Sequence, residues 1–86
     1  MLSEKLSIDH PAIESVWCKP VNGENIVTEY WSILRAAGDG VPPSDVDAVM
    51  ALLAAKASEA TTPVRLYVYD SNGVTLRHLD MGGPHA

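Results

Sequence analysis

Apolar residues at every second position mark two short runs within residues 64–79, and this pattern predicts a β-hairpin. Its two runs are separated by residues that favour turns. A two-residue turn would set Val68 opposite Arg77 and would place a charge on the apolar face. We therefore predict a three-residue loop that ends at Gly73 in the left-handed conformation, because this loop keeps the apolar residues together.

This register pairs Asp70 with Val74 and divides the other side chains between two faces. The core face would carry Val64, Leu66, Val68, Val74, Leu76 and His78. The opposite face would carry Arg65, Tyr67, Tyr69, Thr75, Arg77 and Leu79. Such residues suit the solvated side of an ordinary strand, but tyrosine and arginine are also favoured in interfaces. We take as candidate partner-binding residues Arg65, Tyr67, Tyr69 and Arg77.

Apolar residues at helical spacing predict a helix over residues 45–60. Pro42 and Pro43 interrupt the chain before it, and Ser44 is an N-cap residue with Asp47 three positions later. The apolar stripe consists of Val46, Val49, Met50, Leu52, Leu53 and Ala57. We expect this stripe to face the core.

Residues 24–37 also carry apolar side chains at helical spacing, and they predict another helix that Gly38 would end in a left-handed cap. A strand is the competing interpretation. Asn22 and Gly23 form a strong hairpin signal, and the β-branched and aromatic residues that follow favour strands. Residues 13–31 would then form a second hairpin.

Residues 11–21 suit either a short helix, since Ile13, Val16 and Trp17 have helical spacing, or an edge strand. We favour a third strand at residues 13–19, because Pro20 limits any helix there to about two turns. Residues 1–10 show no clear period, and residues 81–86 contain two glycines and a proline that leave little to pack, so we expect both ends to be loose. The whole chain, 1–86, is expected to be one α+β domain. In it two helices pack on a small antiparallel sheet, in the order β-α-α-β-β.

The charge of the chain narrows the choice of partner. Eleven acidic and six basic residues give a formal net charge of −5. A negative surface repels phosphate and anionic lipid, so nucleic acid and membranes are disfavoured. We expect instead another protein with a basic surface. A homodimer is also expected to be possible, because association adds proportionally more stability to a small domain.

The expected location is the cytoplasm. Cys18 is the only cysteine, so no internal disulfide can form and nothing indicates an oxidising compartment. Residues 1–10 include Glu4 and Asp9 and lack the apolar core of a signal peptide. The longest apolar run, residues 48–55, is far shorter than a membrane span.

The sequence contains no recognisable catalytic or metal-binding motif. The spacing of His10, Cys18, His78 and His85 matches no zinc pattern, the glycines form no phosphate loop, and no serine lies in a GxSxG elbow. We predict no cofactor, no metal and no enzymatic activity. The predicted function is a small acidic interaction domain, such as an inhibitor, adaptor or immunity-type protein. The alternatives are a homo-oligomeric assembly subunit and a small enzyme that uses Cys18 or a histidine.

Overall fold

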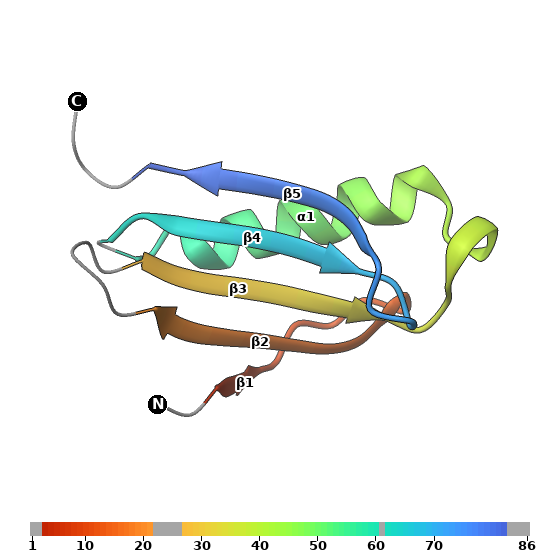
Figure 1. Ribbon diagram of the computed structural model, residues 1–86, viewed down its shortest axis with the longest axis horizontal. Helices are drawn as coiled ribbons and strands as arrows, with labels where there is room; N and C mark the ends of the chain where they lie inside the picture. The colour runs from red at the N-terminus through yellow and green to blue at the C-terminus, as the bar shows by residue number, and fades with distance from the viewer. Residues whose placement is uncertain (1–2, 22–26, 61, 83–86) are drawn as a thin grey trace.

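The computed structural model describes residues 3–21, 27–60 and 62–82, and it places a helix on one face of a five-stranded sheet (Figure 1). A short 3-10 turn, η1 (Gly38–Gly40), leads into this helix, α1 (Pro43–Ala57). The strands are β1 (Glu4–Leu6), β2 (Ile13–Val21), β3 (Val27–Leu34), β4 (Val64–Tyr69) and β5 (Thr75–Met81).

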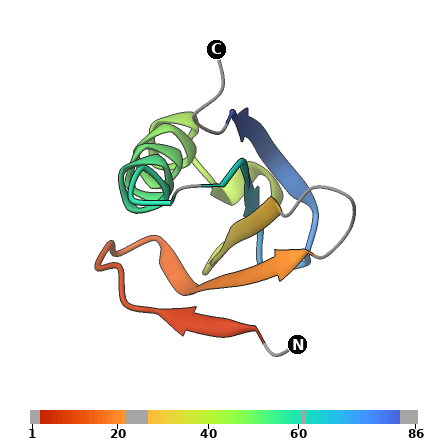
Figure 2. The ribbon, with the colours of Figure 1, turned by 90° about the vertical axis from the view of Figure 1, so that its left-hand side faces the viewer.

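The strands lie across the sheet in chain order, from β1 to β5. Neighbouring strands are antiparallel except for β3 and β4, which run parallel. A parallel pair needs a crossover, and α1 supplies it by returning the chain along one side of the sheet. Figure 2 shows the sheet curving round this helix. None of the described elements lies on the other side, which faces the viewer in Figure 1.

The core lies between α1 and the strands that face it. Leu53 of α1 and Leu66 of β4 are fully buried there. The complete buried cluster consists of Ile13, Val16, Leu34, Val46, Val49, Met50, Leu53, Ala57, Val64, Leu66 and Val68. The predicted helical stripe therefore does face the core, with Leu52 only partly buried at its margin.

The predicted helix at residues 24–37 is wrong, because this part of the chain forms β3. Within the described residues the fold has one α-helix on a mixed five-stranded sheet, in the order β-β-β-α-β-β, instead of two helices on an antiparallel sheet in the order β-α-α-β-β. Ser32 and Leu34 of β3 face α1, whereas Trp31 and Ile33 face away. A central strand with large side chains on both faces satisfies helical spacing by accident, and its β-branched and aromatic residues favour the strand.

The first half of the chain follows the hairpin alternative. The strand predicted at residues 13–19 is confirmed as β2, which pairs with β3 in the antiparallel sense. The turn predicted at Asn22 and Gly23 lies outside the described residues. The sequence showed no period in residues 1–10, yet β1 forms within this segment and pairs with β2.

Helix α1 confirms the helix predicted at residues 45–60, but it begins earlier and ends at Ala57. Its N-cap is Pro42 instead of the predicted Ser44, and no side chain caps the helix. Proline suits the first turn because its missing N–H would have had no partner within the helix. Gly38 adopts a positive φ of 56°, as predicted, but it follows a strand and does not end a helix.

The predicted three-residue loop between β4 and β5 is confirmed. Gly73 has a φ of 82°, and the N–H of Asp70 donates to the carbonyl of Val74 at 2.9 Å. The Asp70 carboxylate accepts hydrogen bonds from the N–H groups of Asn72, Val74 and Gly38 at 2.8, 3.0 and 3.3 Å. These donors stabilise the charged form and lower the pKa of Asp70, with Val74 contributing most.

The predicted register holds only beside this loop, because a β-bulge shifts the pairing by one residue. Tyr69 pairs with Thr75, but Val68 pairs with Arg77. Arg77 therefore lies on the α1 side of the sheet, where its guanidinium contacts the Asp47 carboxylate. The predicted placement of Arg77 on the tyrosine face is wrong, because a one-residue shift reverses the side on which a residue lies.

Candidate functional site

The side of the sheet that α1 does not cover, called the open face below, carries a row of large side chains that crosses all five strands. The aromatic row contains, from β1 to β5, Lys5, Trp17, Trp31, Tyr67 and His78. Lys5 Nζ lies 6.0 Å from the centroid of a Trp17 ring, and the Tyr67 and His78 rings stack at 5.1 Å. The pairing register therefore places one side chain of this row on every strand, from one edge of the sheet to the other.

A second row of the open face lies two residues away along each strand and alternates in charge. The charged row contains, from β2 to β5, Lys19, Glu29, Arg65 and Asp80. Arg65 Nη1 lies 4.0 Å from Glu29 Oε2, and Asp80 Oδ1 lies 2.8 Å from His78 Nε2. The order of signs across the sheet is positive, negative, positive, negative.

A third row borders the aromatic row on its other side. This mixed row contains, from β2 to β5, Ser15, Ile33, Tyr69 and Thr75. The rings of Tyr67 and Tyr69 stack at 5.8 Å with an interplanar angle of 8°, and Trp17 Nε1 donates to Ser15 Oγ at 3.0 Å. Burial raises the pKa of the Tyr69 phenol, and nearby Tyr67 and Glu29 raise it further. The phenol is therefore neutral, and it presents an uncharged ring.

The open face has the composition of an interface. It carries both tryptophans of the chain and two of its three tyrosines. These side chains are only half-buried, and they lie outside the core cluster. Neighbouring aromatic rings shield each other, but no described element packs over them. A contiguous apolar patch of this kind on a small domain is typical of a surface that binds a macromolecule.

Charge is distributed unevenly between the open face and the rest of the molecule. The open face carries three basic side chains and two acidic ones, whereas the rest of the described chain carries three basic and eight acidic ones. The net negative charge of the protein therefore comes from outside the open face. A partner that approaches this face meets a surface that is nearly neutral.

The structure brings together three of the four predicted binding residues. Arg65, Tyr67 and Tyr69 share the open face, while Arg77 lies on the other side. Sequence reasoning missed Trp17 and the central Trp31, because the predicted helix removed β3 from the sheet. The hairpin signal at Asn22 and Gly23, followed by β-branched and aromatic residues, was the signal that could have placed Trp31 in a strand of the sheet.

The candidate nucleophile and metal ligands are not brought together. Cys18 and Trp17 are consecutive in β2, so Cys18 lies on the α1 side, whereas His78 lies on the open face. Burial raises the pKa of the Cys18 thiol and so disfavours the reactive thiolate. Within residues 3–21, 27–60 and 62–82, no three His, Cys, Asp or Glu side chains could hold a metal together. His85 lies outside these ranges.

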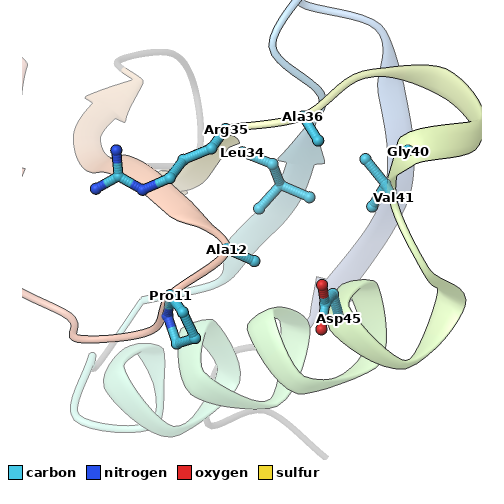
Figure 3. A pocket seen from close by; sticks show the side chains of 8 residues that line it. All are labelled: Pro11, Ala12, Leu34, Arg35, Ala36, Gly40, Val41 and Asp45. Atoms are coloured by element: carbon cyan, nitrogen blue, oxygen red, sulfur yellow. The ribbon is translucent and has the colours of Figure 1, made fainter.

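A small cavity of about 180 Å³ lies between the start of α1, the residues just before β2 and the end of β3 (Figure 3). The Asp45 carboxylate borders it, whereas Arg35 extends away and pairs with Glu14 at 3.0 Å. The rest of the lining is mainly apolar and consists of Pro11, Ala12, Leu34, Ala36, Gly40 and Val41. Sites for drug-sized ligands usually exceed about 300 Å³, so the open face is the stronger candidate.

No helix in the described part of the chain has the length and hydropathy needed to cross a membrane. Comparison with protein-family models, with curated proteins and with solved structures finds no match for this chain. The functional inference therefore depends on the geometry and chemistry of the open face.

Proposed function

We propose that the protein is a non-catalytic interaction domain that binds another protein through its open face. The aromatic row supports this proposal most strongly, because it places Trp17, Trp31 and Tyr67 side by side on a face without a second layer. Tryptophan, tyrosine and arginine are the residues that contribute most to binding in protein interfaces. Arg65 lies next to this row, so the face combines all three types.

The charges favour a partner with a specific pattern. The charged row alternates in sign, and like charges set opposite each other would oppose binding. The partner surface that docks on the open face is therefore expected to alternate as well. A uniformly basic partner surface, as expected from the net charge, suits instead the acidic residues of α1, which include Asp45 and Asp47. We place this activity in the cytoplasm, in a role such as inhibitor, adaptor or immunity-type protein.

Affinity capture from native extract tests the proposal with one variant on each side of the sheet. Arg65 and Arg77 lie in the same hairpin on opposite sides of the sheet. We expect a partner protein to be retained by the wild type and by Arg77→Ala, and to be lost from Arg65→Ala combined with Tyr67→Ala. Circular dichroism of each variant confirms that it is folded. A partner that is lost equally from Arg77→Ala would contradict the assignment to the open face.

Single-stranded nucleic acid is the competing ligand, because bases stack on aromatic sheet faces that also carry basic side chains. The two tryptophans report directly on this possibility, since both lie on the open face. We expect single-stranded DNA and RNA oligonucleotides to leave tryptophan fluorescence unchanged at physiological salt. Saturable quenching that weakens with added salt would contradict the proposal and would identify single-stranded nucleic acid as the ligand of the open face.

A further inference from the structure

We propose that the partner of the open face is a second copy of this chain, bound face to face about a twofold axis. The axis would run parallel to the strands, between β3 and β4. This inference rests on the proposed function, since it names the partner for the same face. A twofold interface uses one surface twice, so every group must face a compatible group after the rotation. The three rows of the open face meet this condition.

The charged row is complementary to itself. Rotation about the proposed axis keeps each row in place and reverses its order, so β2 faces β5 and β3 faces β4 of the second copy. Lys19 then faces Asp80, and Glu29 faces Arg65. Each pair occurs twice, which gives four attractive pairs and no repulsive one. A row with any of these four signs reversed would lose this property.

The other two rows match as well. In the aromatic row, Trp31 faces Tyr67, and Trp17 faces His78. In the mixed row, the apolar side chain of Ile33 faces the ring of Tyr69. Ser15 faces Thr75, so the two hydroxyl-bearing residues of this row face each other. Packed sheets are rotated by about 30° to each other, so the residues of β3 and β4 near the axis keep the closest match.

The remaining charges do not oppose this association. The acidic excess lies outside the open face, and α1, which carries Asp45 and Asp47, lies on the far side of the sheet. Edge strand β1 would extend beyond β5 of the second copy, because nothing in the described chain follows β5 in the sheet. Lys5 would therefore remain accessible at the rim.

The size of the face predicts a reversible dimer. The face consists of four strands spaced about 4.8 Å apart, each about six residues long with a rise of about 3.3 Å per residue. Its flat area is roughly 400 Å², without the additional area of the side chains. A standard interface buries about 800 Å² on each partner, so this one is small. We expect dimer and monomer to exchange with concentration.

Sedimentation velocity and tryptophan emission over a range from micromolar to millimolar protein test the inference. We expect the sedimentation coefficient to rise with concentration. The emission maximum should move to shorter wavelength in parallel, because both tryptophans would be covered. A wild-type chain that remains monomeric throughout would overturn the inference but not the proposed function, which the capture of a different protein through Arg65 and Tyr67 would still support.

Two charge variants give the sharper test. Glu29→Arg sets two positive charges opposite each other, and Arg65→Glu sets two negative charges opposite each other, so each variant alone should be monomeric. In a mixed dimer of these two variants, all four pairs of the charged row become attractive. We therefore expect an equimolar mixture to associate. A mixture that stays monomeric while the wild type dimerises would overturn the proposed axis.

Cross-linking of the wild type keeps the test valid if a charge variant does not fold. Lys19 and Asp80 lie three strands apart in one chain, about 14 Å, which is too far for a zero-length carbodiimide link. In the proposed dimer they face each other. We expect a cross-linked dimer that contains a peptide joined through Lys19 and Asp80. Dimers cross-linked only through other residues would contradict the axis.

Discussion

The two sides of the sheet are built from alternate residues of the same strands, and both carry large apolar side chains. The side under α1 is closed: Leu66 and its neighbours are fully buried. The open face carries Trp17, Trp31 and Tyr67 in a comparable arrangement, yet they remain half-buried. The helix is the difference between them. An apolar face contributes to stability when the chain itself covers it, and to binding when a partner must cover it.

Two consecutive residues of β4 provide the largest expected contrast. Leu66→Ala opens a cavity under α1 and should lower the free energy of unfolding by about 3 kcal/mol. Tyr67→Ala removes ring contacts on the open face, with Tyr69 of the same strand and with His78 of β5, and should cost about 1 kcal/mol or less at low protein concentration. Urea titration of both variants measures the difference. Equal losses would mean that the open face belongs to the core.

The stability of the loop between β4 and β5 should decrease in acid, because the Asp70 carboxylate holds this loop together. Asp70 has a pKa below its ordinary value of 3.8, so its contribution to stability is present above that pH and is lost as the pH falls through the lower, folded pKa. Asp70→Asn should lower the melting temperature by several degrees at neutral pH and flatten its decline in acid. Thermal melts between neutral pH and strong acid measure both effects. A variant that melts like the wild type at every pH would show that the loop does not depend on this carboxylate.

One polar side chain interrupts the covered side. Ser32 is fully buried between β3 and α1, and its hydroxyl has no hydrogen-bond partner within the described structure. Ser32→Ala removes this unsatisfied group with little change in volume, so it should raise the free energy of unfolding by about 1 kcal/mol. Chemical denaturation provides the measurement, and Ser15→Ala on the open face is the matched control. A destabilised Ser32→Ala variant would indicate a partner for this hydroxyl.

The smallest effect is expected at Arg77. Its ion pair with Asp47 is largely exposed, and such pairs contribute little because water screens them. Arg77→Ala should change the free energy of unfolding by less than about 0.5 kcal/mol and should leave self-association unchanged. Arg65→Ala should be equally mild in stability but should weaken association. If both variants lose association alike, the two sides of the hairpin do not differ in function.

Local patterns in the sequence predicted the local parts of this fold. The loop at Gly73, the helix that buries Leu53 and the strand at residues 13–19 follow from spacing and turn chemistry, although β2 continues through Pro20 to Val21. Strand β3 could not be separated from a helix by periodicity, since both of its faces carry large side chains. The bulge beside Tyr69 has no signal in the sequence that we can identify, and it alone moved Arg77 away from the tyrosines.

The candidate site was harder to predict than the fold, because it depends on pairing between distant segments. Arg65, Tyr67 and Tyr69 alternate within one strand, so the sequence places them together. Trp31 joins them only through the parallel pairing of β3 with β4, which no turn specifies. The alternating signs of the charged row likewise become visible only when the strand order is known.

The parallel pairing of β3 and β4 also has a consequence for how the protein matures. The antiparallel pairs form between segments close in sequence, but β3 and β4 meet only after the intervening helix has crossed the sheet. Non-local pairing of this kind is intrinsically slow. Trp31 of β3 and Tyr67 of β4 are paired across these two parallel strands. A newly made chain would therefore complete its open face only once β3 and β4 have paired.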